Sequence, residues 1–242
     1  MKGNYIHLIL LLFLCSSCWQ EDFDSLNEEC TSGCTVISGK FTTKTNEPVA
    51  NIPVGLRFEN KGTFGMTSST RHIASTKTDA NGNYYIKFRL RDREFGDSAS
   101  KYGGHVLLNF SFDKQKFLEI PWYNISEGDE LIGSISKRDT TIVTDFHIAT
   151  RTKIRIRLKG YSTPVPNDHF SIITTCAVGA NKTETSGGFI EASGINTEKE
   201  VDACGNQLTT LYIRKKKNGI YTLKDTAVYA PVGQITAVEF TY

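Results

Sequence analysis

The stretch that decides the fold is TDANGNYYIKFRL at residues 78–90. Its first half is a turn signal, because Asp79 can accept hydrogen bonds within its own turn and Gly82 tolerates a positive φ. In its second half every second residue from Tyr84 to Leu90 is large and apolar. Alternation with period two is the pattern of a strand that buries one face. The stretch therefore predicts a tight turn that leads into a half-buried strand.

The same alternation recurs along the rest of the chain. It is found at 54–58, 106–112 and 153–159. The pair Asn218-Gly219 lies between two further runs and favours a type I′ hairpin, in which both central residues take a positive φ. β-branched and aromatic residues are abundant, and no twelve-residue segment keeps a helical period. The sequence predicts an all-β fold of two tandem antiparallel β-sandwiches.

Charge and length limit the function and the number of domains. The 242 residues carry 28 Lys and Arg against 26 Asp and Glu, a net charge of +2 at pH 7. A nucleic-acid-binding protein would have a much larger basic excess, so no nucleic-acid partner is expected. We expect four parts, namely a signal peptide at 1–17, a tether at 18–34, a first sandwich at 35–150 and a second at 151–242.

Part of the first sandwich resembles a known family. The resemblance is carried by SGKF at 38–41, EPVANIPV at 47–54 and TKTDANGNY at 76–84. These pieces are similar to the carboxypeptidase regulatory-like (transthyretin-like) domain, which has a Gly in its first strand, a Pro-containing hairpin and a Thr-Asp-x-x-Gly-x-Tyr/Phe turn. The resemblance covers 35–90, is thinner to 150 and is absent beyond. It implies that the first sandwich is transthyretin-like and says little about activity.

The first residues of the chain predict export. Lys2 precedes an apolar run at 8–14 that is far shorter than the ~20 residues of a membrane-spanning helix, and small residues follow it. This is the pattern of a signal peptide at 1–17. Ser16-Ser17-Cys18 resembles the lipobox of bacterial lipoproteins, which implies that Cys18 is acylated and becomes the new N-terminus. Cys15 stands where that motif usually has Leu, and ordinary cleavage is the alternative.

The segment after Cys18 is acidic. Residues 18–34 contain five acids and neither Lys nor Arg. Acidic residues just after a lipidated cysteine resemble the surface-export signal of lipoproteins in some Gram-negative lineages, and a solvated tether is the alternative. We therefore expect a lipoprotein that is anchored in the outer membrane by fatty acyl chains such as palmitate and exposed at the cell surface.

Four further cysteines remain in the exported part. They are Cys30, Cys34, Cys176 and Cys204. An even number in an oxidising compartment indicates disulfides, for which three pairings exist. We favour Cys30–Cys34 with Cys176–Cys204. A zinc site is the competing interpretation, but the close C-x-x-C spacing is missing and no His is placed to help, so no metal is expected.

Two surface features are candidates for binding. Trp122 and Tyr123 follow a turn-forming Pro and could stack on a sugar ring or anchor a protein; alternatively Trp122 closes one end of a sandwich. The basic run at 214–217 precedes the Asn218-Gly219 turn. It could meet an anionic lipid or polysaccharide, or keep the edge of a hairpin soluble.

Four triplets have the form Asp-Ser/Thr followed by a small or aliphatic residue. This resembles the O-glycosylation acceptor motif of exported proteins in some Gram-negative anaerobes, and Thr-rich strands also produce such triplets. The candidate acceptors are Ser25, Ser98, Thr140 and Thr226.

No catalytic motif is recognised. The chain has no His-Glu-x-x-His, no Gly-x-Ser-x-Gly and no Gly-rich phosphate loop, so we expect neither an enzyme nor a cofactor. The prediction is a lipid-anchored binding or accessory module for a protein or glycan partner in an envelope assembly. The alternative is a structural subunit of a fimbria or pilus, in which the terminal strand at 235–242 either completes its own sheet or is donated. A third possibility is the accessory piece of a carboxypeptidase encoded elsewhere.

Overall fold

The computed structural model describes most of the chain after residue 26. The described residues are 19–22, 27–60, 68–95, 104–118, 128–133, 135–160, 168–180, 184–186, 188–192 and 197–242. They form an all-β structure, as predicted, with one short 3₁₀ turn, η2 (Asp92–Glu94). No helix in these ranges is long and apolar enough to cross a bilayer.

Within the described residues, seventeen strands form three sheets. The five-stranded sheet has the order β1 (Trp19–Asp22), β4 (Ser68–Lys77), β3 (Pro53–Asn60), β6 (Gly104–Phe110) and β7 (Gly128–Gly133). The three-stranded sheet has the order β14 (Thr197–Cys204), β10 (Arg151–Lys159) and β17 (Ile235–Thr241).

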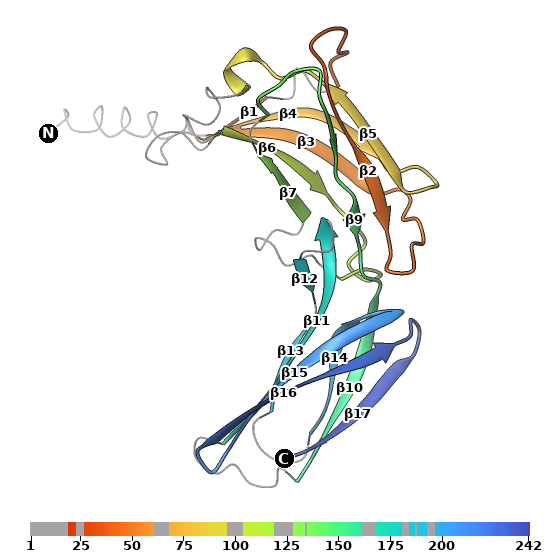
Figure 1. Ribbon diagram of the computed structural model, residues 1–242, viewed down its shortest axis with the longest axis vertical. Coiled ribbons are helices and arrows are strands. Elements are labelled where there is room, and N and C mark those ends of the chain that lie inside the picture. The colour runs from red at the N-terminus through yellow and green to blue at the C-terminus, as the bar shows by residue number, and fades with distance from the viewer. Residues whose placement is uncertain are drawn as a thin grey trace, which may run out of the picture.

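The longest sheet runs through both halves of the molecule. Its order is β16 (Ile220–Ala230), β15 (Gln207–Lys217), β11 (His169–Ala180), β9 (Phe146–His147), β2 (Thr35–Thr42) and β5 (Asn83–Phe88). Three short strands join it, because β12 (Glu184–Ser186) and β13 (Phe189–Ala192) pair with β11 and β8 (Thr141–Val143) pairs with β2. Figure 1 shows the first sandwich in the upper half and the second in the lower half, with β11 reaching from the lower half toward β9.

The first core forms because the predicted alternation places one apolar row on each strand. The side chains from Tyr84 to Leu90 that were expected to face inward are buried. At the centre Phe41 lies against Phe146, with ring centroids 4.7 Å apart, and against Phe110 at 5.2 Å. Such aromatic contacts add to the burial of apolar area. The first sandwich therefore has its own aromatic core.

Contacts in the structure explain two motifs of the first sandwich, the turn at Asp79 and the glycine at position 39. Asp79 Oδ1 accepts the N–H groups of Asn81 and Asn83, both at 2.8 Å, and Gly82 has a φ of 78°. These hydrogen bonds, chiefly those from Asn83, hold the pKa of Asp79 below its usual range. A Cβ at Gly39 would lie 1.9 Å from the carbonyl oxygen of Thr144, so only Gly allows the two backbones to approach.

The second core lies between the three-stranded sheet and the lower part of the long sheet. Ile154, Ile156 and Leu158 on β10 are buried, again as the alternation predicted. They pack with buried side chains of β11, β14 and β15. Val238 and Phe240 of β17 pack against the same cluster, and β17 pairs in parallel with β10. In this structure the last strand therefore completes its own sheet.

One strand belongs to both sandwiches. The first part of β11 pairs with β15 and contributes Phe170 and Ile172 to the second core. At its end Gly179 and Ala180 pair with β9, and Ala180 joins the first core. The boundary expected near residue 150 stays a prediction, and the two halves share a continuous hydrogen-bonded strand.

Candidate interaction surface

The sequence-based candidates fall into three groups. Cys18, Trp122, Tyr123, Ser25 and Ser98 lie outside the described residues. The four remaining cysteines and the two threonines are described.

The two candidate acceptor threonines are half-buried. Thr140 accepts the backbone N–H of Val36 through its carbonyl at 2.9 Å. Thr226 lies on β16 opposite Leu211, on the face that turns toward the core. Glycosylation at either residue stays a prediction.

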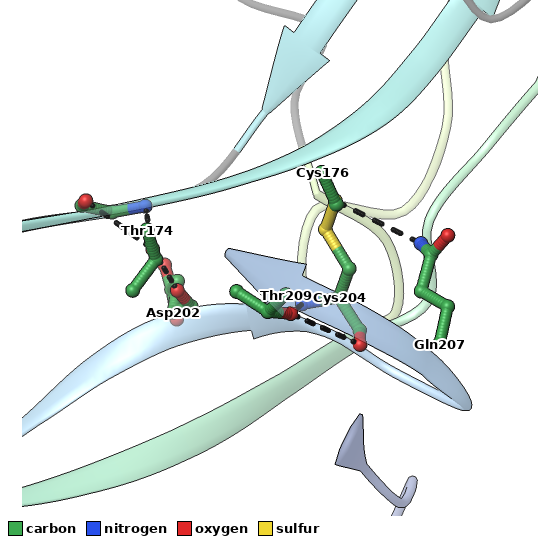
Figure 2. Close-up of a disulfide and its surroundings, with 7 residues drawn as sticks. Thr174, Cys176, Asp202, Cys204, Gln207 and Thr209 are labelled. Carbon is green, nitrogen blue, oxygen red and sulfur yellow. Dashed lines mark hydrogen bonds between the residues drawn. A yellow bond between two sulfur atoms is a disulfide. The ribbon is translucent and has the colours of Figure 1, made fainter. Parts of the chain in front are cut away.

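Both favoured disulfides are present. Cys30–Cys34 has a Cα–Cα distance of 5.8 Å and Cys176–Cys204 one of 6.3 Å. The second links β11 to β14 and therefore joins the long sheet to the three-stranded sheet. Figure 2 shows its surroundings, in which Thr209 Oγ1 accepts the N–H of Cys204 at 3.1 Å. The disulfide and this hydroxyl are buried, so the link is protected from solvent.

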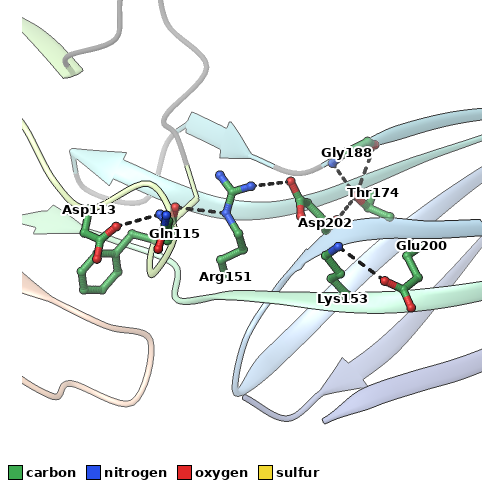
Figure 3. A network of polar contacts seen from close by, with 9 residues as sticks. Asp113, Gln115, Arg151, Lys153, Thr174, Gly188, Glu200 and Asp202 are labelled. Carbon is green, nitrogen blue, oxygen red and sulfur yellow. Dashed lines mark hydrogen bonds and ion pairs between the residues drawn. The ribbon is translucent and has the colours of Figure 1, made fainter. Parts of the chain in front are cut away.

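A polar network extends from this disulfide to the start of β10 (Figure 3). Arg151 donates from Nη1 to Asp202 Oδ2 at 2.8 Å and from Nε to the carbonyl of Phe117 at 3.4 Å. Nearby, buried Thr174 accepts the N–H of Gly188 at 2.6 Å and donates to the carbonyl of Asp202 at 2.7 Å. These contacts fix the two sheets of the second sandwich relative to each other and to the segment at Phe117.

The outer face of the three-stranded sheet is charged. We call it the charged face; it comprises the outward side chains of β10 and their partners on β14 and β17. Arg155 donates to Glu200 at 2.9 Å and Arg157 to Glu198 at 2.8 Å. Ion pairs on this face are Arg151–Asp202, Lys153–Glu200, Arg155–Glu198, Arg155–Glu200, Arg157–Glu198 and Lys159–Glu239.

The same pairs shift the acid–base equilibria on this face. The hydrogen bond from Arg155 lowers the pKa of Glu200, and the hydrogen bond to Glu200 raises the pKa of Arg155. The paired side chains of the charged face therefore each have a neighbour of opposite charge, and such cross-strand pairs are favourable on a sheet face exposed to solvent.

The opposite outer face of the second sandwich is different. We call it the apolar face; it is formed by β13, β15 and β16 and comprises Phe189, Leu208, Tyr212, Tyr221, Leu223 and Tyr229. Their exposed fractions lie between 47% for Tyr212 and 76% for Leu223. Across the hairpin, Leu208 stands opposite Tyr229 and Lys216 opposite Tyr221. Among the large exposed apolar side chains of the described residues, only Tyr85 and Val143 lie in the first sandwich.

The apolar face reverses the usual pattern on β16. Its outward positions include Tyr221, Leu223 and Tyr229 besides Asp225, whereas the core side carries polar residues such as Thr222 near the turn and apolar ones, Val228 and Ala230, only farther along. A strand that only closed a sandwich would have the opposite arrangement. Charged side chains of Arg214, Lys216 and Asp225 stand between these apolar residues. Several large apolar side chains exposed on one sheet face indicate a surface that another molecule covers. Sequence reasoning missed this face, although the alternation at 220–230 carried the signal.

The hairpin that carries this face has the predicted turn. Asn218 and Gly219 have φ values of 51° and 80°, as a type I′ turn requires. The basic run at 214–217 is divided between the two sides of the hairpin. Lys215 and Lys217 lie over the ring of Tyr242, at 5.0 and 5.1 Å, whereas Lys216 lies over Tyr221 at 5.1 Å. The run is therefore not one basic patch.

Two polar cavities lie beside residues 27–31. One of about 370 Å³ lies between residues 27–30 and the strands β4 and β5. A second of about 140 Å³ adjoins it near Arg71 and Arg89. Within the described ranges, no group of three or more His, Cys, Asp or Glu side chains could hold a metal ion. The flat apolar face is thus the strongest candidate site in this part of the chain.

Comparisons with known proteins return bacterial surface proteins at low similarity. The sequence matches no protein-family model and no curated protein. A streptococcal ancillary pilin is 11% identical at a TM-score of 0.29, and the match covers 88% of this chain and 63% of that one. The tip fimbrial protein of Porphyromonas gingivalis, truncated at its C-terminus, is 9% identical at 0.28, with 84% of each chain covered. The major pilin subunit of Bacillus cereus is 11% identical at 0.27, covering 82% and 69%. These neighbours are pilus and fimbrial proteins, and at such scores the likeness carries no conclusion about activity or assembly.

Proposed function

We propose that this chain is a non-catalytic structural subunit of a cell-surface assembly of the fimbrial or pilus kind, anchored in the outer membrane through acyl chains on Cys18. The observation that carries the proposal is the apolar face on β13, β15 and β16. A flat face of exposed aromatic and aliphatic side chains suits a protein partner better than a small ligand, which is usually bound in a concave pocket.

The sequence supports the anchor. A signal peptide at 1–17 and a lipobox-like Ser16-Ser17-Cys18 would place the protein outside the inner membrane. One acyl chain holds a protein only marginally, so stable anchoring at Cys18 would require two or three chains. The acidic residues 18–34 would then connect the anchor to the first sandwich. The two disulfides are compatible with an oxidising compartment.

The anchor is tested with Cys18→Ser in the native host. The wild-type chain should incorporate radiolabelled palmitate, partition with the outer membrane and be cleaved by protease added to intact cells. The Cys18→Ser chain should lose the label and leave the membrane fraction. Unchanged processing and partitioning of this variant would contradict the lipid anchor.

The assembly function is tested at the apolar face. In envelopes cross-linked before extraction, the wild-type chain should migrate in complexes larger than the monomer. The double variant Leu208→Ser/Tyr229→Ser should shift to the monomer position. The matched control Arg155→Gln/Glu200→Gln alters the charged face and should leave the complexes intact. If both double variants behave like wild type, the apolar face does not hold the assembly together.

A second candidate function is glycan binding. Tyr212, Tyr221 and Tyr229 expose their rings on one face beside Arg214 and Lys216. Aromatic rings with neighbouring polar groups are suited to stacking on sugars. A glycan array probed with the whole chain distinguishes the two functions, since a structural subunit should bind no glycan in a way that depends on these tyrosines.

A further inference from the structure

We propose that β16 is a strand-addition edge for a second copy of this chain, with Leu223 of the two copies meeting on a two-fold axis. This pairing deepens the proposed assembly function and rests on it. Within the described part of the chain β16 is the last strand of the long sheet, and no strand pairs along its other side. Its eleven residues form a long, exposed edge with apolar side chains, which is the type of edge that recruits another strand.

The hairpin geometry determines which backbone groups face outward. Lys217 and Ile220 flank the two-residue turn and form a hydrogen-bonded pair, so pairs alternate from there along the hairpin. The N–H and C=O groups of Tyr221, Leu223 and Asp225 therefore point to the free edge. The side chains of the same residues lie on the apolar face. A strand that pairs with this edge would extend the sheet and the apolar face together.

Charge argues against two antiparallel registers and allows the one centred on Leu223. An antiparallel pairing centred on Lys224 or on Asp225 would place that residue opposite its own copy, and like charges directly opposite are destabilising. Residues 220–225 are all exposed, and farther from the turn the outward residues Ala227 and Tyr229 are exposed while the core-side Thr226 and Val228 are half-buried. A centre at Leu223 pairs residues 221–225 of the two copies, all of them exposed, and brings no like charges together.

The register centred on Leu223 is also complementary. It places the most exposed large apolar side chain of the described residues, Leu223 at 76%, against its own copy. It places Asp225 of each copy opposite Tyr221 of the other. Because Lys216 lies over the ring of Tyr221 at 5.1 Å, the carboxylate of Asp225 would approach an ammonium group. A second copy of the chain thus supplies the apolar and acidic groups that this edge requires.

Cysteine cross-linking tests the register with the full chain. Under mild oxidation Leu223→Cys should form a covalent homodimer, and a mixture of Tyr221→Cys chains with Asp225→Cys chains should form a heterodimer. The control Leu208→Cys lies on the same face, is 61% exposed and belongs to the inner strand β15, so it should give no homodimer. Equal cross-linking of Leu208→Cys and Leu223→Cys would overturn the proposed edge.

A charge exchange tests complementarity without new thiols. Asp225→Lys should raise the dissociation constant of the dimer at least about tenfold, because it sets two cations side by side. The double variant Lys216→Asp/Asp225→Lys should restore association, as measured by sedimentation of the full chain in detergent. Failure of the double variant to restore association would contradict the register.

The outcomes separate this inference from the proposed function. A chain that stays monomeric at all concentrations, with no homodimer of Leu223→Cys, overturns the pairing of copies. If Leu223→Cys then cross-links to a different protein in envelopes, the edge serves another subunit and the assembly function stands. If neither cross-link forms and the Leu208→Ser/Tyr229→Ser variant still migrates in the same large complexes as wild type, both proposals fail.

Discussion

The two outer faces of the second sandwich cover the same hydrophobic core and differ in chemistry. On the charged face, Arg155 and Arg157 of β10 pair with Glu200 and Glu198 of β14. On the apolar face, Leu223 stands opposite Arg214 and Tyr221 opposite Lys216, so the cations of β15 lie beside exposed apolar side chains and not beside acids. The charged face is suited to contact with solvent, whereas the apolar face has the composition of a surface that a protein covers.

The difference shows that stability and association are assigned to different parts of one sandwich. The core, the disulfide Cys176–Cys204 and the hydroxyl of Thr174 hold the two sheets together. The charged face contributes little, because exposed ion pairs are weak. The apolar face should contribute almost nothing to the fold of the single chain. The following experiments test this assignment and are ordered by decreasing expected change in stability.

Removal of the link between the two sheets should have the largest effect. The Cys176→Ala/Cys204→Ala variant loses a disulfide that spans 28 residues, which corresponds to about 3.5 kcal/mol on the chain-entropy view. Urea unfolding of the whole chain measures the loss. The control Cys30→Ala/Cys34→Ala removes a disulfide that spans only 4 residues and should cost less. An equal or larger loss in the control would contradict the assignment.

Removal of one buried hydroxyl should have the next effect. Thr174→Val keeps the shape of the side chain but leaves the N–H of Gly188 and the carbonyl of Asp202 without this partner. Unsatisfied buried polar groups cost about 1–3 kcal/mol. Thermal unfolding should show the loss, whereas Thr175→Val, on the outer side of the same strand, should unfold at nearly the wild-type temperature.

Acid should reduce the stabilisation that the ion pairs of the charged face provide, and only slightly. The pKa of Glu200 is lowered in the folded chain by the hydrogen bond from Arg155, so the unfolded chain binds its proton first as the pH falls. The contribution of ionised Glu200 to the free energy of unfolding is therefore fully present above the ordinary pKa of Glu. It is lost as the pH drops through the lower pKa that Glu200 has in the folded chain. The melting temperature at decreasing pH should fall less for Glu198→Gln/Glu200→Gln than for wild type. High salt should reduce this difference.

Substitution on the apolar face should have the smallest effect on stability. Leu223→Ala removes an exposed side chain and should change the free energy of unfolding by no more than about 0.5 kcal/mol. Leu211→Ala on the neighbouring strand removes a fully buried side chain and should cost about 2–5 kcal/mol. Urea unfolding at a concentration where the chain is monomeric compares the two. A large loss for Leu223→Ala would show that this face supports the fold itself.

Local patterns made much of the fold predictable. The alternation at 84–90 and 153–159 identified buried faces, and the Asn218-Gly219 pair identified a hairpin turn, because these features depend on neighbouring residues. The favoured cysteine pairing was also confirmed. The apolar face was missed because each of its strands looks like an ordinary half-buried strand until pairing shows that both of its sides carry large apolar residues.

Long-range pairing lay beyond the sequence patterns. Nothing local indicates that β2 runs parallel to β8 and β9, that β10 runs parallel to β17, or that β11 contributes to both cores. Strand partners are chosen by contacts between residues far apart in the chain, and several arrangements satisfy the same alternation.

The sequence by itself determined that this protein is built of strands, where two of its turns lie and which side chains enter a core, since these follow from the spacing of neighbouring residues. Only the tertiary structure decided which strand ends the long sheet, and therefore that β16 exposes both its backbone edge and Leu223. The physical reason is that a strand is an edge or an interior strand only through its neighbours in space, which the chain brings together on folding.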